Sequence, residues 1–257
     1  MNGIKYLIPE VLNFLADQVI YIMKQGLIIM TMLAFTACNE LIGERGNDER
    51  ITKEITVDNF EKIEVSGAFD ILLKPSESDK VVLEADENLI RYIDISVRGN
   101  RLYIETDKRL VSRKGIKIEV PIKVLREINS SGASDIENTD PITSEELEII
   151  VSGTGKVDLK LDVKLVALDL SGATLVYLEG VAERLEVGMS GAGSLAAEGF
   201  EVQDCAVNIS GVGHVLVNVS GNLEAQVSGL GRVEYLGKPT SVKGDVSGVG
   251  DVTKAKE

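Results

Sequence analysis

The dipeptide Ser-Gly returns along the second half of the chain at a nearly constant interval, and this repeat limits the fold more than any other feature. Ser-Gly followed after one residue by Gly, Ser or Thr occurs seven times, at spacings of 18 to 21 residues. Such a period is typical of stacked supersecondary units. The seven pairs are Ser131-Gly132, Ser152-Gly153, Ser171-Gly172, Ser190-Gly191, Ser210-Gly211, Ser228-Gly229 and Ser247-Gly248.

Apolar residues occupy fixed positions on both sides of each pair. The residue before the Ser is apolar in six of the seven units, with Ser130 as the exception, and the residue five positions after the Ser is apolar in all seven. The positions between them are polar or mixed. This alternation predicts two short half-buried strands joined by a tight corner. We expect the corner glycines to adopt positive φ, which only Gly does freely.

One such strand pair cannot bury its apolar face alone. Coils stacked about 4.8 Å apart place like residues over like and form a continuous core. We therefore predict an all-β fold, a parallel β-solenoid with coils of about 19 residues. Four positions before the Ser, the residues alternate between Glu and Ala, which separates like charges in a stack. They are Glu148, Ala167, Glu186, Ala206 and Glu224.

The composition divides the chain into four segments. Residues 1–37 hold an upstream extension and a signal peptide, and the polar, Gly-containing residues 38–50 predict a flexible tether. Residues 51–128 have longer apolar runs without the repeat, and we expect a less regular β segment that caps the solenoid. Within it, Gly99-Asn100 between alternating runs predicts a tight hairpin. Residues 129–257 hold the regular Ser-Gly repeats.

A targeting signal begins at Met23, where the chain reads MKQGLIIMTMLAFTACNE. Basic Lys24, a short apolar run and small residues before Cys38 resemble a bacterial lipoprotein signal peptide. Its lipobox is Phe35-Thr36-Ala37-Cys38, in which Phe35 departs from the usual Leu. The resemblance implies a true start at Met23 and a lipid on Cys38. The apolar run is short for a membrane span, and an ordinary anchor or a buried helix is the alternative.

Charge and composition exclude some partners. The net charge of −14 argues against nucleic acid, whose phosphates require Lys and Arg patches. The absence of Trp weakens a lectin that stacks sugars on aromatic rings. Asn39 stands where some inner-membrane lipoproteins carry Asp, so we expect the outer membrane, with the side of that membrane left open.

The chain resembles a known family over one long stretch and the repeats that follow it. The stretch reads FEKIEVSGAFDILLKPSESDKVVLEADENLIRYIDISVRGNRLYIE, and it is followed by REINSSGASDI and the repeated SGxG units. It resembles the putative auto-transporter adhesin, head GIN domain family that is common among Bacteroidetes lipoproteins. The resemblance covers about residues 55 to 253. It implies a right-handed, single-stranded β-helix at the cell envelope, and it implies no catalytic residues.

Several motifs suggest chemistry only weakly. Gly153-Thr154-Gly155 and Gly211-Val212-Gly213 are Gly-rich, but a strand follows where a phosphate-binding loop needs a helix. Calcium-binding β-rolls need a regular Asp after the turn, and only Asp135 and Asp251 occupy that position. We expect no metal and no cofactor.

Two single residues have structural interpretations. His214 is the only histidine and falls in an outward column, so we expect it on the solvated surface. Cys205 falls in an apolar column and is expected to fill the core, with a reactive thiol as the alternative. The acidic residues Asp158, Asp169, Asp245 and Glu234, with Lys156 and Arg232 near them in sequence, form no specific catalytic pattern.

These observations predict a lipid-anchored envelope protein, not an enzyme, whose solenoid displays outward side chains to a protein or glycan ligand. Two alternatives stay open. One is a structural module that packs into homo-oligomers, which should show an outward apolar patch. The other is a polysaccharide-active β-helix, which should show carboxylates facing each other across a cleft.

Overall fold

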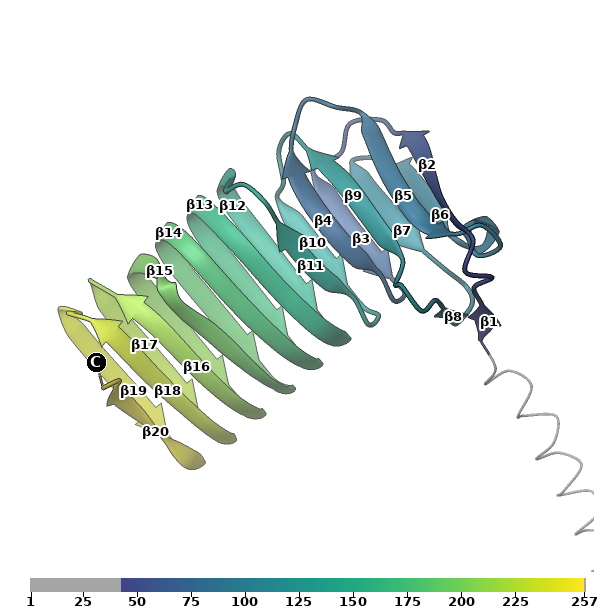
Figure 1. The fold of residues 1–257 in the computed structure, drawn as a ribbon. Helices are drawn as coiled ribbons and strands as arrows, with labels where there is room; N and C mark the ends of the chain where they lie inside the picture. The colour runs from purple at the N-terminus through teal and green to yellow at the C-terminus, as the bar shows by residue number, and fades with distance from the viewer. Residues whose placement is uncertain (1–42, 257) are drawn as a thin grey trace, which may run out of the picture. The chain divides into compact units, whose positions relative to one another are not determined.

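The computed structural model describes residues 43–256, and Glu44–Glu257 forms one compact unit. The predicted signal peptide and Cys38 lie outside the described residues. The described part is built from strands, with one 3₁₀ turn (Figure 1). Among these residues, no helix has the length and apolar character needed to cross a bilayer.

The Ser-Gly repeats form the stacked coils of a parallel β-solenoid, as the sequence predicts. The coil strands pair in parallel with the strand one coil further along. The strands are β10 (Glu127–Ser130), β11 (Asp135–Asn138), β12 (Ile142–Val151), β13 (Thr154–Leu170), β14 (Ala173–Met189), β15 (Ala192–Ile209), β16 (Val212–Val219), β17 (Asn222–Val227), β18 (Leu230–Gly237), β19 (Ser241–Val246) and β20 (Val249–Lys254).

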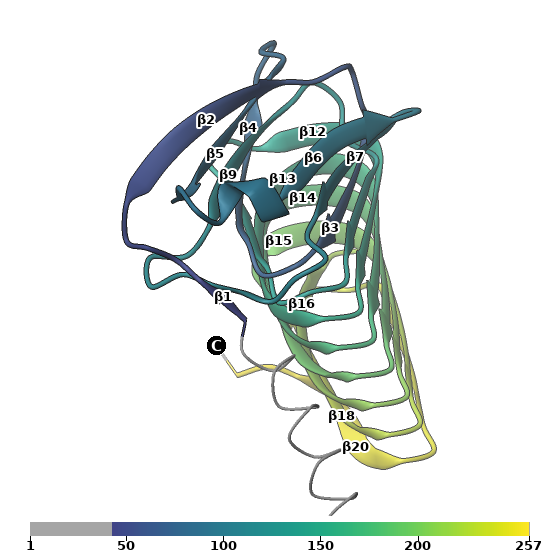
Figure 2. The same ribbon diagram turned by 90° about the vertical axis from the view of Figure 1, so that its right-hand side faces the viewer.

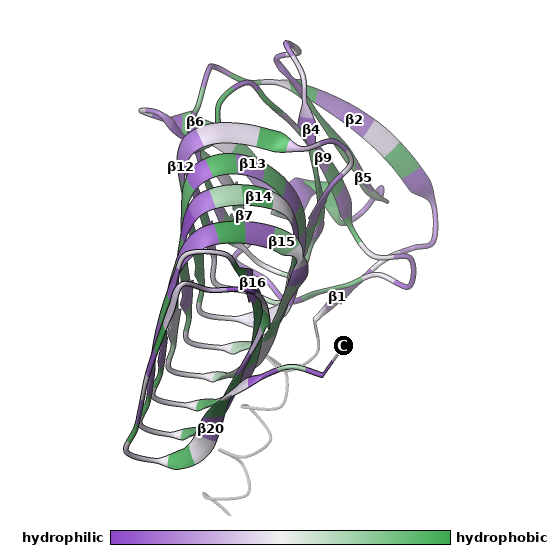
Figure 3. Cartoon of the chain, turned by 90° about the vertical axis from the view of Figure 1, so that its left-hand side faces the viewer, coloured by the Kyte–Doolittle hydropathy of each residue, from purple (hydrophilic) through white to green (hydrophobic). Residues whose placement is uncertain are grey.

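The register places equivalent residues of successive units in contact, which confirms the predicted columns. The column five positions after the Ser stacks as Ile136, Val157, Val176, Leu195, Val215, Val233 and Val252. All but the last are buried in one continuous core. The Glu and Ala residues of the alternating column are also neighbours in the ladder. Apolar and polar bands alternate along the strands (Figure 3).

The corner glycines differ from the expectation of positive φ, because none of the seven has one. Glycine is required there by close stacking. A Cβ on Gly153 would lie 1.8 Å from the carbonyl oxygen of Gly132, and a Cβ on Gly172 would lie 1.7 Å from that of Gly153. Coils at this separation leave no room for a side chain at the corner. The recurring glycine is therefore required by the short distance between coils and not by the backbone conformation of the turn.

The N-terminal part of the unit contains two more coils. Its elements are β1 (Glu44–Arg45), β2 (Arg50–Thr56), β3 (Lys62–Ser66), β4 (Asp70–Pro75), β5 (Lys80–Asp86), the 3₁₀ turn η1 (Ile90–Tyr92), β6 (Asp94–Arg98), β7 (Arg101–Glu105), β8 (Leu110–Val111) and β9 (Lys117–Ile122). Strands β3 and β4 stack directly beneath β10 and β11, and β7 and β9 stack beneath β3 and β4. The outermost coil, which we call the first coil, is therefore formed by β7 and β9, and the second coil is formed by β3 and β4, which come earlier in the chain.

Antiparallel strands cover the first coil (Figure 2). Strand β6 pairs with β7, β5 pairs with β9, and β2 pairs with β5. The β6–β7 connection is the two-residue hairpin predicted at Gly99-Asn100, where Gly99 has a φ of 68°. Both edges of the first coil therefore have partners.

The segment predicted as a flexible tether differs from that expectation over residues 43–50. Strand β1 pairs in parallel with β8, and Asn47 and Asn88 share a hydrogen bond of 3.0 Å. The Arg50 guanidinium donates to the Gly115 carbonyl at 2.6 Å. Polar composition suggested flexibility, but these polar groups find partners in the folded unit.

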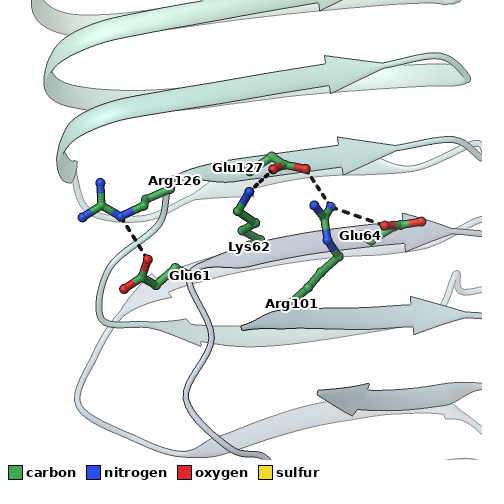
Figure 4. Close-up of polar contacts among 6 residues, drawn as sticks. All are labelled: Glu61, Lys62, Glu64, Arg101, Arg126 and Glu127. Carbon is green, nitrogen blue, oxygen red and sulfur yellow. Dashed lines mark hydrogen bonds and ion pairs between the residues drawn. The ribbon is translucent and has the colours of Figure 1, made fainter. Parts of the chain in front are cut away.

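A network of charged side chains joins the first coils to the repeats (Figure 4). The buried Glu127 carboxylate on β10 accepts from Lys62 on β3 and Arg101 on β7, both at 2.7 Å. Arg101 also contacts Glu64 at 3.3 Å. Burial alone would raise the pKa of Glu127, but hydrogen bonds from Lys62 and Arg101 hold the pKa below its ordinary value. One carboxylate thus links three adjacent strands.

Replacing a corner glycine is expected to destabilise the solenoid. Gly172→Ala should lower the free energy of unfolding by about 1–3 kcal/mol or more, because its Cβ must displace a backbone carbonyl. Thermal melting of Gly199→Ala is the control, since the nearest atom to that Cβ is 3.5 Å away. Equal melting temperatures for the two variants would contradict the stacking constraint.

Removing the Glu127 charge is also expected to destabilise the protein. Glu127→Gln should cost about 1–3 kcal/mol at pH 7, because the amide keeps one acceptor oxygen, turns an NH2 group toward one of the two cations and removes the negative charge between them. Since the folded pKa is lowered, this stabilisation is present above the ordinary value of 4.5 and is lost as the pH falls through the folded pKa. Denaturant titrations at pH 7 and pH 3 should therefore show a smaller difference at the lower pH.

Candidate ligand-binding cleft at the Ser-Gly corners

The Ser-Gly corners form one edge of the solenoid. At each of the seven corners, the Ser backbone N–H donates to a carbonyl of the preceding coil at 2.8–3.0 Å. The serine side chains are exposed, and the Ser131 hydroxyl also donates to the Val65 carbonyl at 3.3 Å. Backbone hydrogen bonds therefore hold each corner, and the serine side chains stay exposed at the edge of the solenoid.

One coil departs from this pattern at the corner. Between β7 and β9, residues 106–116 replace the two-residue corner with a longer excursion that includes β8. Residues 44–46 hold the excursion in place. The backbone N–H groups of Glu44 and Gly46 donate hydrogen bonds to the carbonyls of Arg109 and Val111 at 2.8 and 2.9 Å. The Lys108 ammonium contacts Glu44 at 3.1 Å. We name residues 106–116 the corner loop.

The corner loop and the neighbouring corners enclose a hollow of about 810 Å³, which we call the corner cleft. The backbone of Gly67, Gly132 and Gly155 contributes to its wall. Its polar side chains come from both sides and are Ser66, Asp70, Thr106, Asp107, Lys108, Arg109, Ser112, Asp135 and Thr154. Hydroxyls, both signs of charge and backbone groups therefore converge on a concave surface, as they do in small-ligand sites.

Two carboxylates stand at the side of the cleft. Asp70 and Asp135 are neighbours in the ladder, with Lys117 next to Asp70 on the other side. The Asp135 carboxylate accepts the Lys156 backbone N–H at 2.8 Å. Burial and then the charge of Asp135 raise the pKa of Asp70, against the opposite effect of Lys117. Asp70 therefore takes up a proton more readily than an ordinary aspartate.

The same two aspartates also border a groove on the adjoining outward face. This groove of about 660 Å³ is lined by carboxylates from β5, β9 and β11, namely Glu84, Glu119 and Glu137. Carboxylates and backbone carbonyls accept hydrogen bonds from hydroxyl groups, so the cleft and the groove together suit a polyhydroxylated ligand. No group of three metal-ligating side chains occurs among residues 43–256.

A shallower hollow lies on the sheet face that precedes the corners. Its volume is about 490 Å³, and its floor contains Ala167, Gly188 and Ala206. Its polar residues are Glu148, Asp169, Glu186, Asn208, Glu224 and Gln226. The alternation of Glu and Ala in the sequence thus produces a trough as well as charge separation. We call this surface the trough.

The residues singled out from the sequence are dispersed over the unit. His214 is exposed and its ring nitrogen lies 2.6 Å from Glu234 on the next coil. Lys156 pairs with Asp158 at 2.5 Å, and Asp169 borders the trough. Asp245 and Asp251 lie in the last coil. Of the residues singled out from the sequence, Asp135 borders the corner cleft, together with Gly132, Thr154 and Gly155.

Cys205 is 3% exposed and packs in the core between coils, where the sequence places it. Burial raises the pKa of the thiol to about 12, with a small opposing effect from Arg184. A thiol with this pKa is almost entirely protonated at neutral pH and is a poor nucleophile.

The repeat pattern did not predict the corner loop, Asp70 or the coil to which Asp70 belongs. Ser66-Gly67 is a further corner, on which Gly132 stacks, but bulky Phe69 stands where the repeat has Gly, Ser or Thr. Phe69 is buried in the core. Ser-Gly between two alternating runs, with no condition on the residue three positions after the Ser, is the signal that indicates this corner.

Comparison with known proteins places the chain within a family. A family model described as "Putative auto-transporter adhesin, head GIN domain" matches residues 59–239. No curated protein matches the chain.

Solved structures share the fold. A putative adhesin from Bacteroides fragilis has a TM-score of 0.78 and 25% identity, over 83% of this chain and 100% of that one. A putative adhesin from Parabacteroides merdae has a TM-score of 0.61 and 24% identity, over 84% and 100%. A putative lipid binding protein from Parabacteroides distasonis has a TM-score of 0.67 and 21% identity, over 82% and 99%.

Replacing Asp70 by Asn is expected to stabilise the protein at pH 7. The folded pKa is raised, so the charged form of Asp70 costs stability above that pKa, and the cost disappears as the pH falls below the ordinary value of 3.8. Asp70→Asn should raise the melting temperature at pH 7. The difference should vanish near pH 3, and a lower melting temperature at pH 7 would contradict the assignment.

The Cys205 thiol is expected to resist modification in the folded protein. In a Cys38→Ser variant, Cys205 is the sole cysteine, since the chain has two. A disulfide reagent such as dithiobis(nitrobenzoate) should label less than a tenth of it in native buffer at pH 8, and all of it in denaturant, because the thiol is buried. Rapid native labelling would show that the core opens at this coil.

Proposed function

Because the chain belongs to the putative auto-transporter adhesin, head GIN domain family, we propose that it is a non-catalytic, lipid-anchored envelope protein whose solenoid holds a ligand-binding cleft at a fixed position. The anchor is the lipid on Cys38, and the location is the outer membrane. The family name supports a role in binding. The signal-peptide pattern at residues 23–38 supports the anchor.

The observation that carries this proposal is the corner loop. Insertions in repeat proteins form loops on one face, and that face often binds the ligand. Here the only excursion in place of a Ser-Gly corner among the described coils encloses the corner cleft, and residues 44–46 hold it in place. A pre-formed cleft on a rigid solenoid loses little conformational freedom when a ligand binds.

The ligand class that suits the cleft is a glycan. The lining supplies hydroxyls, carboxylates, Lys108 and backbone groups, which can donate to and accept from sugar hydroxyls. Phe69, the aromatic residue in the cleft lining, is 2% exposed, and the exposed Tyr177 lies outside the lining. The cleft therefore recognises hydroxyl patterns by hydrogen bonds, without the ring stacking of aromatic lectins.

One observation favours a second candidate, a polysaccharide-active enzyme. The Asp70 carboxyl has a raised pKa beside a second carboxylate, Asp135, and glycosidases use such unequal carboxyl pairs. Incubation with the glycans that bind separates the two functions. Release of reducing ends that is lost in Asp70→Asn would establish the enzyme, and unchanged glycans support the binding protein.

Blocking the cleft is expected to abolish binding. Ala133 lines the cleft and stands two positions after a corner Ser, and Ala173 has the same position two coils further on, outside the lining. On an array of bacterial and host surface glycans, Ala133→Arg should weaken binding at least tenfold, because the long side chain fills the cleft. Ala173→Arg should bind as the unmodified protein does. Equal loss in both variants, or none in either, contradicts the site.

Protease treatment of intact cells tests the location. An anchored surface protein should disappear from blots while a periplasmic marker survives, and Cys38→Ser should leave the membrane fraction because it cannot receive the lipid. Complete protection from protease would place the solenoid in the periplasm and would remove the adhesive role. Retention of Cys38→Ser in the membrane fraction would contradict the lipid anchor.

A further inference from the structure

The two ends of the solenoid are finished differently. Both strands of the first coil are covered by antiparallel partners, as described above. In the last coil, β19 pairs only with β17 and β20 only with β18, within the described residues. The outer edges of β19 and β20 thus present unpaired backbone donors and acceptors, which is the usual template for pairing with another strand.

The inward side chains of β19 are exposed as well. Val242 is 41% and Val246 is 39% exposed, whereas Leu223 and Val227, which occupy the same columns one coil earlier, are each 1% exposed. Every residue from 241 to 250 is exposed. Apolar residues meant for a solenoid interior therefore lie at an open end, where another strand would bury them.

The sequence of this strand is complementary to itself in the antiparallel direction. Residues 241–247 read Ser-Val-Lys-Gly-Asp-Val-Ser, with Gly244 at the centre. A twofold axis through Gly244 would place Lys243 opposite Asp245 of a second copy, twice, on the outward face. It would place Val242 opposite Val246 of that copy, twice, on the inward face. Directly opposite charges and β-branched pairs stabilise antiparallel strands.

Within the described residues, this complementarity stands at an open edge only in the last coil. Lys62 and Glu64 of β3 occupy the same two columns, but β3 has a partner strand on each side. The equivalent two outward positions hold Glu127 and Asn129 in β10, Glu148 and Ile150 in β12, Ala167 and Asp169 in β13, Glu186 and Gly188 in β14, Ala206 and Asn208 in β15, and Glu224 and Gln226 in β17. None of these pairs contains a cation. The Lys243 ammonium contacts Glu224 at 2.7 Å but is 75% exposed, so it can also meet a carboxylate beyond the edge.

We propose that β19 pairs antiparallel with β19 of a second copy of this chain, about a twofold axis at Gly244, to form an end-to-end dimer. The contact uses the same surface on both copies and is therefore closed. Because antiparallel strands cover the other end of each solenoid, the pairing stops at two copies and does not continue as a fibre. The corner cleft lies in the first coils and is not part of this contact.

Disulfide trapping of the full-length chain in cells tests the pairing. Residues directly opposite in an antiparallel pair have Cα atoms about 4.5–5.5 Å apart, which a disulfide can span. Gly244→Cys faces itself across the axis and should form crosslinked dimers on a non-reducing gel. In the Ser241→Cys variant, the new cysteine faces Ser247 of the second copy. This variant should therefore give at least tenfold less crosslinked dimer than Gly244→Cys.

A Cβ on Gly244 lies 3.2 Å from Val252, so a second trap guards against local distortion. Ser241→Cys and Ser247→Cys should each fail to crosslink alone and should crosslink when the two variants are expressed together. Crosslinking of either single variant as strong as that of the pair would overturn the register.

Charge reversal tests the pairing without relying on geometry alone. In the Gly244→Cys chain, Lys243→Asp or Asp245→Lys places like charges opposite each other twice, and the crosslinked fraction should fall about tenfold. The double reversal Lys243→Asp and Asp245→Lys restores opposite charges and should restore the crosslink. Failure of the double reversal to recover, or capture of a different protein in place of a second copy, would overturn the proposal.

Discussion

The rest of the structure depends on the contact between glycine and carbonyl at the corners. Each corner Ser donates its backbone N–H to the coil before it, and the Gly that follows lies so close to the preceding corner that a Cβ has no room. This contact fixes the register once in every coil. Because side chains alternate between inside and outside, a slip of one residue would turn every apolar column toward solvent. The corner therefore protects the core, although it contains no apolar side chain of its own.

The same stacking explains why the N-terminal part could join the repeats out of chain order. Ser66-Gly67 supplies a corner onto which Gly132 stacks, although 65 residues separate them in sequence (132 − 67 = 65). The intervening chain makes one more coil and the strands that cover it. Glu127, Lys62 and Arg101 then join three strands that come from distant parts of the chain. A buried carboxylate with two cations is sensitive to geometry, so this network favours one arrangement of the strands over others.

The functional proposals rest on departures from the repeat. A regular solenoid offers similar columns along its length, and specificity needs positions that differ. The corner loop replaces one Ser-Gly corner and creates a cleft, and β19 places opposite charges at an unpaired edge, in columns that hold no cation in β10, β12, β13, β14, β15 and β17. In the two proposals, one departure binds a ligand and the other pairs with a second copy. They lie in the first and last coils, so a long and rigid unit can serve both without interference.

The sequence by itself determined the parallel solenoid, its coil length and its apolar columns, since period-two alternation between regularly spaced glycines has few other solutions. It also placed Cys205 in the core and a hairpin at Gly99-Asn100. The expectation that the corner glycines adopt positive φ was wrong. Close approach between coils and positive φ both require glycine, so the sequence cannot distinguish the two causes. Only the tertiary structure decided that β7 and β9 lie beneath β3 and β4, and that residues 44–46 hold the corner loop. These contacts join segments far apart in the chain through backbone hydrogen bonds, which any residue except proline can donate and which therefore leave no signal in one sequence.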